Sequence, residues 1–129
     1  MSYNVFISYS MSDSSWAYDL SAQLGRKRIM CYLDCMESGF STNEYIKHLV
    51  EESQLYVVLA GEKLSSTPYA QSLLRHAIET GKTILAFSTD NTSLAEELSS
   101  HAVPSTRETI VADIERLINT TDSADGQSA

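Results

Sequence analysis

Basic side chains are scarce in this sequence of 129 residues, which has nine lysines and arginines against seventeen aspartates and glutamates. The formal net charge is −8 at pH 7, and the isoelectric point is about 4.7. Nucleic acids and anionic membranes are bound through basic patches, so the charge balance argues against both as partners. The basic cluster Arg26-Lys27-Arg28 is interpreted as a solvated helix end, where cations interact favourably with the helix dipole.

Long apolar runs are also absent from the sequence. The longest one, residues 55–60, is far shorter than the roughly 20 residues that a membrane-spanning helix needs. The N-terminus has no basic region followed by an apolar stretch, so we expect no secretory signal. A cytoplasmic location is therefore expected.

Cysteine is rare, with only Cys31 and Cys35 in the chain. In one strand these two residues would lie about 13 Å apart, which is too far for a disulfide. No pair of histidines stands near them at metal-ligand spacing, so we predict no metal site. Cys31 is expected in the core and Cys35 as a reduced thiol at a strand end, which suits a reducing compartment.

Short apolar runs alternate with amphipathic stretches along the chain. The runs at residues 3–10, 29–33, 55–60, 83–87 and 102–103 predict five strands. Capping patterns at residues 13–14, 41–44, 67–68, 93–96 and 105–108 begin five predicted helices. In the second helix, Tyr45, Ile46, Leu49 and Ser53 are expected on the buried face, and Gly81 is expected to end the third helix.

This alternation predicts a flavodoxin-like α/β fold. Right-handed crossovers give a parallel sheet with helices on both faces, and five strands favour the order 2-1-3-4-5. A ligand crevice is expected beside the carboxyl ends of the first and third strands. We expect a single domain over residues 1–120, followed by a flexible polar tail over residues 121–129.

Two functions that share this architecture fail at particular positions. A flavodoxin-type phosphate loop needs glycine after the first strand, and residues 9–13 contain none. A phosphoacceptor receiver domain would have an aspartate at the end of the third strand and a lysine in the fifth. The third strand ends instead in Leu59-Ala60-Gly61, and the fifth contains no lysine.

Several short motifs agree, in the right order, with one known family. Val5-Phe6-Ile7-Ser8-Tyr9-Ser10, followed by Asp13 and Trp16, resembles the first box of TIR (Toll/interleukin-1 receptor) domains. Cys31-Tyr32-Leu33-Asp34 and Gly39 resemble the family's second strand and the loop after it. Ser65-Ser66 and Gly81-Lys82 extend the resemblance, which covers residues 3 to 90. It implies the TIR fold, expected here as a stand-alone bacterial protein.

The resemblance implies one of two kinds of function. Some TIR domains recruit other TIR domains through the loop after the second strand and through neighbouring helices. Others cleave NAD at the nicotinamide–ribose bond, often as an immune or antiphage signal. In those enzymes a glutamate near the start of the third helix stabilises an oxocarbenium-like ribose.

This sequence departs from the enzymatic pattern in the third helix. Tyr69 takes the family's aromatic position, and Leu73 stands four residues later, where the glutamate is expected. Leucine cannot stabilise a developing cation, so the central group of the usual mechanism is missing. Candidate substitutes are Glu62, after the third strand, and Glu37, in the loop after the second, although surface charge is the favoured interpretation of both.

Two groups of binding residues are implied by the resemblance. The candidates for nucleotide binding are Ser8, Tyr9, Ser10, Asp34 and Tyr69. The loop expected to contact other TIR domains consists of Cys35, Met36, Glu37, Ser38, Gly39 and Phe40. For Ser8, Tyr9 and Ser10, packing at the strand end is an equal alternative.

Two hypotheses from different classes remain open. The first is a signalling and assembly module of an immune or antiphage system, with other TIR domains or its own copies as partners and an NAD-like nucleotide as candidate ligand. The second is an NAD glycohydrolase or cyclase with a displaced carboxylate or one donated by a neighbouring subunit. No cofactor is firmly implied, and a domain without any ligand is a third alternative. We favour the assembly module because of Leu73.

Overall fold

The computed structural model describes residues 3–38, 44–61, 64, 66–88 and 102–128. All five predicted strands are present, and they pair in parallel in the predicted order β2-β1-β3-β4-β5. Their bounds are β1 Val5–Tyr9, β2 Cys31–Cys35, β3 Leu55–Ala60, β4 Thr83–Ser88 and β5 Ala102–Ser105. Every residue of β1 and β3 is buried, which explains their uninterrupted apolar sequences.

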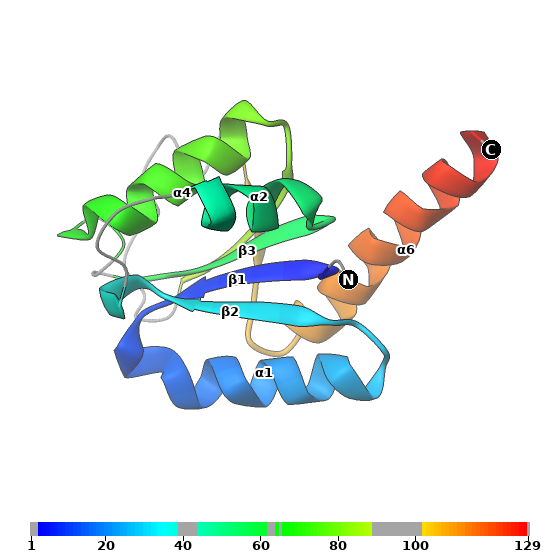
Figure 1. Cartoon of the computed structure of the whole chain (residues 1–129). Helices are drawn as coiled ribbons and strands as arrows, with labels where there is room; N and C mark the ends of the chain where they lie inside the picture. Colours follow the sequence, from blue (N-terminus) through cyan, green and yellow to red (C-terminus); the bar gives the residue numbers. More distant parts are fainter. Residues whose placement is uncertain (1–2, 39–43, 62–63, 65, 89–101, 129) are drawn as a thin grey trace.

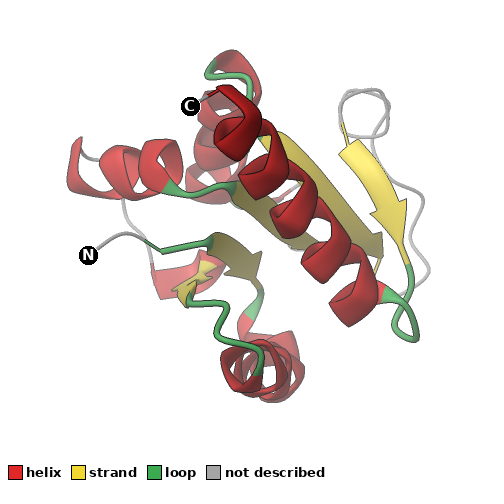
Figure 2. Ribbon diagram, turned by 90° about the vertical axis from the view of Figure 1, so that its right-hand side faces the viewer, coloured by secondary structure: helices red, strands yellow, loops and turns green. Residues whose placement is uncertain are grey.

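Helices cover both faces of the sheet, as expected for this topology. They are α1 Ser14–Arg26, α2 Glu44–Glu52, α4 Pro68–Glu79 and α6 Ile110–Ser128, with 3-10 turns η1 at Met11–Asp13 and η2 at Met36–Ser38. Figure 1 shows α2 and α4 on one side of the sheet and α1 on the other. Figure 2 shows α6 lying across the sheet, on the α1 side.

Two separate cores result from this layering. Phe6, Tyr56 and Ile84 pack beneath α2 and α4, and the alternate residues of the same strands pack beneath α1 and α6. The alternation follows from the two-residue period of a strand. Any side chain at a strand end can therefore be assigned to one face by counting from these core residues.

The helix ends agree with several predictions and correct others. Thr67 precedes α4 with Pro68 at its start, and Gly81 follows it with a φ of 74° that suits glycine. Tyr45 was expected on the buried face of α2, but it is 65% exposed. Tyr45 lies in the first turn of α2, and side chains lean toward the N-terminus of a helix, so it is directed away from the later turns that contribute Leu49 and Val50 to the core.

The last helix also extends further than expected. Its backbone continues through residues 121–128, where a flexible polar tail was predicted. The flexibility of this segment stays a prediction. The capping residues at 41–43, the helix at 93–100, Glu62, Gly39 and Phe40 lie outside the described residues.

Candidate functional site

Polar residues of two neighbouring strands meet at the carboxyl end of the sheet. Ser8 in β1 is in register with Asp34 in β2 and with Val58 in β3. Ser8 and Asp34 are both buried. They lie on the face covered by α2 and α4, because Ser8 is two residues from Phe6, which packs in that core.

Asp34 is tied to the first turn of α4. The Tyr69 hydroxyl donates a hydrogen bond to Asp34 Oδ1 at 3.0 Å. Burial raises the pKa of Asp34 to about 6, and the bond from Tyr69 offsets part of that rise. Burial, followed by the charge of Asp34, raises the pKa of Tyr69. The pair is thus a donating tyrosine and a carboxyl group that takes up a proton near pH 6.

Three buried polar atoms around this pair are unsatisfied. Asp34 Oδ2, Ser8 Oγ and the Tyr56 hydroxyl have no hydrogen-bond partner in the described part of the chain. Burial raises the pKa of Tyr56, and the nearby Ser8 hydroxyl offsets part of that rise. The two hydroxyls are nevertheless not placed well enough to form a hydrogen bond with each other. Buried polar atoms are normally paired, so this group, the Asp34 cluster (Ser8, Asp34, Tyr56 and Tyr69), has unused capacity to form hydrogen bonds.

Glu37 does not point at the Asp34 cluster as a spare carboxylate. Its Oε2 accepts a hydrogen bond from the Ser10 hydroxyl at 2.8 Å, and its Oε1 accepts one from the Met11 amide at 3.0 Å. Ser10 Oγ also lies 3.2 Å from Ser12 Oγ. Glu37 therefore clamps η2 to the turn that follows β1.

The five nucleotide-binding candidates do not form one site. Ser8, Asp34 and Tyr69 come together, whereas Tyr9 lies on the opposite face, in the core beneath α1 and α6. The Tyr9 ring meets the ring of Tyr18 at 6.1 Å between centroids. Ser10 belongs to the Glu37 clamp instead. All five side chains are buried, so as described they form no open pocket.

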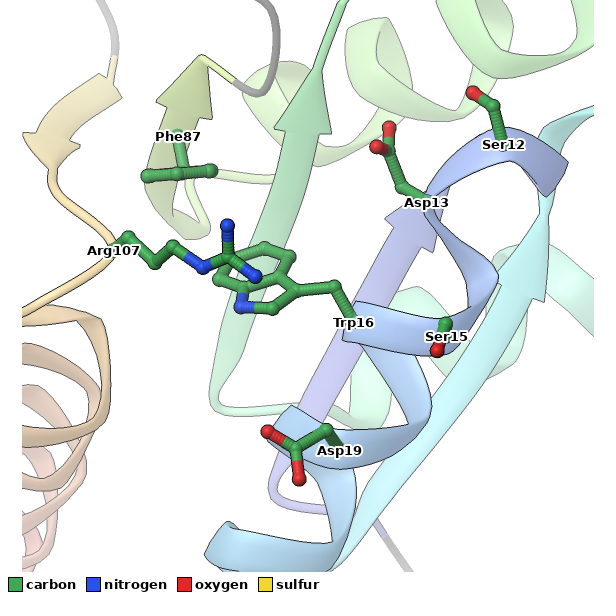
Figure 3. Close-up of a pocket in the computed structure, with 7 residues that line it drawn as sticks. All are labelled: Ser12, Asp13, Ser15, Trp16, Asp19, Phe87 and Arg107. Carbon is green, nitrogen blue, oxygen red and sulfur yellow. The ribbon is translucent and has the colours of Figure 1, made fainter.

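An open pocket lies elsewhere, on the face covered by α1 and α6. It has a volume of about 520 Å³ and extends from the first turns of α1 to the end of β4 and the segment before α6 (Figure 3). We call it the Trp16 pocket; its lining residues are Ser12, Asp13, Ser15, Trp16, Asp19, Phe87 and Arg107. Trp16 is only half-buried, whereas Ala17, Leu20 and Leu24 of the same helix lie in the core.

Comparison with protein families matches residues 5–119 to the TIR domain. The chain belongs to the TIR domain family. Comparison with curated proteins finds no match. The resemblance inferred from five short motifs is therefore confirmed, and it extends into the first half of α6.

Solved structures that share the fold include TIR domains and a flavoprotein. The TIR domain of the Toll-related receptor TRR-2 from Hydra magnipapillata has a TM-score of 0.73 at 16% identity, covering 92% of this chain and 99% of that one. The RPS4 and RRS1 TIR domain heterodimer has a TM-score of 0.52 at 13% identity, covering 92% of this chain and 96% of that one. The diflavin flavoprotein A3 from Nostoc sp. has a TM-score of 0.63 at 10% identity, covering 92% of this chain and 90% of that one. At these identities the likeness shows the fold alone.

Leu73, which the family resemblance places at the position of the catalytic glutamate, is part of the core in this TIR domain. Leu73 is 0% exposed and packs with Ala70 and Ala77 of α4 and with Val58 of β3 in the same core. A carboxylate here would have to be desolvated, which is costly without a partner. The side chain thus stabilises the packing of α4 on the sheet.

The loop expected to contact other TIR domains is partly internal. Cys35 is the last residue of β2, Met36 is buried in the core, and Glu37 forms the clamp. Ser38 ends η2, and the loop continues beyond the described residues. Tyr45, just after this loop, is the exposed aromatic side chain that sequence reasoning missed.

Membrane and metal sites find no support in the described part of this TIR domain. None of its described helices combines the length and the apolar character required to cross a bilayer. No three described His, Cys, Asp or Glu side chains are grouped so that they could hold a metal ion.

Proposed function

We propose that this TIR domain signals by assembling with other TIR domains or with copies of itself, and that it does not cleave NAD. The observation that carries the proposal is the buried Leu73 at the position of the family's glutamate. NAD cleavage needs a carboxylate that faces the ribose and stabilises the charge that develops there. A leucine in the core cannot do this.

The described carboxylates near the strand ends are poor substitutes. Asp34 is 7% exposed, and Tyr69 already occupies one of its oxygens. With a pKa of about 6, Asp34 also ionises less readily than an ordinary aspartate. Both oxygens of Glu37 accept hydrogen bonds from the turn after β1. Glu62 remains as a candidate, and the experiment below includes it.

An exposed aromatic residue supports assembly. Tyr45 lies in the first turn of α2, directly after the loop that the family resemblance assigns to partner contacts. Tyrosines are enriched at protein interfaces, where the ring supplies apolar contact area and the hydroxyl a hydrogen bond. The RPS4 and RRS1 TIR domains, solved as a heterodimer, show that domains of this family pair with each other.

The proposed setting is immune or antiphage signalling in the cytoplasm. It follows the resemblance to TIR domains that act in such systems. Neither Cys31 nor Cys35 forms a disulfide, which agrees with a reducing compartment. We also propose that an NAD-like nucleotide binds as a ligand without being cleaved. The proposal is supported by the atoms of the Asp34 cluster that have no described hydrogen-bond partner.

NAD turnover tests the catalytic half of the proposal. Purified protein is incubated with NAD at high protein concentration and with a crowding agent, and nicotinamide is measured by chromatography. We expect no release above the protein-free blank. Release that disappears in Glu62→Ala or Glu37→Ala would show a displaced carboxylate and establish the enzyme instead.

Sedimentation over a range of concentrations tests the assembly half. We expect the parent protein to form larger species and Tyr45→Ser to shift the distribution toward the monomer. Tyr18→Ser is the matched control, because Tyr18 is 58% exposed but lies on α1, on the opposite face of the sheet. Equal effects of the two substitutions, or a parent that stays monomeric throughout, would contradict assembly through the surface around Tyr45.

A further inference from the structure

The Trp16 pocket has no part in the proposed function. It lies at the start of α1 and beside the segment before α6, whereas the Asp34 cluster and Tyr45 belong to the α2 and α4 side. Its position is nevertheless one where open α/β sheets bind ligands, because η1 follows the carboxyl end of β1 and Phe87 lies near that of β4. Its volume of about 520 Å³ is within the range of small-molecule sites.

One wall of the pocket is aromatic. The Trp16 and Phe87 rings are packed with centroids 4.7 Å apart and planes inclined by 32°. The guanidinium carbon of Arg107 lies over the Trp16 ring, 5.8 Å from its centroid (Figure 3). That separation is long for a stacked contact, so the guanidinium covers the indole loosely.

The charged groups around this wall lack partners of opposite sign. Arg107 is exposed and forms no ion pair with any described residue. Asp13 and Asp19 are likewise without a cation in the described part of the chain, and Asp19 accepts a hydrogen bond from Gln23 at 2.8 Å. The hydroxyls of Ser12 and Ser15 complete the rim.

These features together define the chemistry of a ligand. An apolar molecule would leave the charged groups unpaired, and a polyanion would meet two carboxylates. A ligand that fits all of them has a flat aromatic ring for Trp16, one anionic group for Arg107, and hydroxyl or amino donors for Asp13 and Asp19. We propose that the Trp16 pocket binds a nucleoside monophosphate.

Each part of such a ligand has a counterpart in the pocket. The base stacks on the face of Trp16 that the guanidinium now covers, because aromatic side chains stack readily on any base. Arg107 moves aside onto the phosphate, to which it can donate two hydrogen bonds. The carboxylates of Asp13 and Asp19 accept hydrogen bonds from the ribose hydroxyls or from an amino group of the base.

The sequence supplies its own reporter for this proposal. Trp16 is the only tryptophan in the chain, so any change in tryptophan fluorescence arises at the pocket wall. Full-length protein is titrated with adenosine 5′-monophosphate, adenosine and inorganic phosphate. We expect a saturable change with the monophosphate, a change at about tenfold higher concentration with adenosine, and none with phosphate alone. No saturable change with the monophosphate overturns the proposal.

Substitutions separate binding at the pocket from a general effect of charge. Arg107→Gln is expected to weaken binding of the monophosphate about tenfold and leave that of adenosine unchanged. The control Arg75→Gln removes the same charge from an exposed position on α4 and is expected to change neither. Equal losses of affinity for the monophosphate in Arg107→Gln and Arg75→Gln overturn the proposal. Thermal unfolding curves verify that both variants are folded.

Calorimetry with Trp16→Phe supplies a second readout that does not depend on fluorescence. Phenylalanine keeps an aromatic wall but has a smaller ring for stacking, so the heat of binding is expected to persist with weaker affinity. Asp19→Asn is measured in the same way. If both single variants bind the monophosphate with undiminished affinity, the ligand binds elsewhere and the proposal is overturned. The NAD and sedimentation experiments involve other residues, so their outcomes are independent of this one.

Discussion

Replacing Asp34 by asparagine should stabilise the protein at neutral pH and have a different effect in acid. Asparagine has nearly the same shape and keeps an oxygen that can accept the bond from Tyr69. It removes a charge from a side chain that is buried beneath α4. The effect depends on pH because asparagine does not titrate, whereas Asp34 does.

The free-energy cost of the buried charge follows from the pKa of Asp34. Burial raises this pKa from its ordinary value of 3.8 to about 6 in the folded protein. Below pH 3.8 the carboxyl is neutral in both states, so its protonation does not affect unfolding. Between pH 3.8 and 6 the folded state holds a proton that the unfolded state releases, so stability falls as pH rises. Above pH 6 the full cost of about 3 kcal/mol is present.

The buried amide of asparagine brings a cost of its own. Its new NH₂ group replaces Asp34 Oδ2, which has no described partner, and an unsatisfied donor costs about 1–3 kcal/mol. That cost is the same at every pH, so it cancels when the variant is compared with the parent at two pH values. The pH-dependent part of the difference is expected to be about 3 kcal/mol in favour of Asp34→Asn at the higher pH.

Urea unfolding of both proteins at pH 4 and pH 7.5 should show about 2.5 kcal/mol of this difference, because the unfolded-state carboxyl, with a pKa of 3.8, is already partly ionised at pH 4. In thermal unfolding the same free energy corresponds to a relative shift in Tm of roughly 10 °C for a domain of this size. A difference between variant and parent that is equal at the two pH values would refute the reasoning, because it would mean that Asp34 keeps an ordinary pKa in the folded protein.

Four further substitutions test neighbouring parts of the structure. Tyr69→Phe removes the donor to Asp34, so we expect a loss of about 1–2 kcal/mol in urea unfolding at pH 7.5 and a smaller loss at pH 4, where the carboxyl is neutral. Leu73→Ala should cost about 2–5 kcal/mol by cavity formation. Leu73→Glu should destabilise the fold without creating nicotinamide release, as followed by circular dichroism and chromatography. Glu37→Gln should increase hydrogen exchange at the Met11 amide, measured by NMR.

The architecture was predictable because its strongest signals are local. The apolar runs of β1 and β3 are buried on both faces, and such runs are read directly from the sequence. Strand order was predictable because five-stranded parallel sheets of this class commonly have the order 2-1-3-4-5. Tyr45 was assigned wrongly because helical periodicity gives the direction of a side chain but not where the neighbouring sheet ends.

The candidate sites were harder to predict because they depend on how the strands are placed. Alternation along β1 already puts Ser8 and Tyr9 on opposite faces, and applying it would have removed Tyr9 from the candidates. The Trp16 pocket carries no comparable signal. Phe87 and Arg107 are distant from Trp16 in sequence and reach it only because β4 and the segment after β5 end near the start of α1.

The Glu37 clamp joins the two regions for which we propose functions. Through Ser10 it holds η2, where the partner-contacting loop begins, against η1, which contributes Ser12 and Asp13 to the Trp16 pocket. A ligand that moves η1 must therefore either carry η2 with it or break the hydrogen bonds to Glu37. Because those bonds are made by both carboxylate oxygens, moving the two turns together preserves more of them than separating the turns does. The carboxylate first considered as a catalytic substitute thus has a structural role: it ties η2 to the turn that borders the Trp16 pocket.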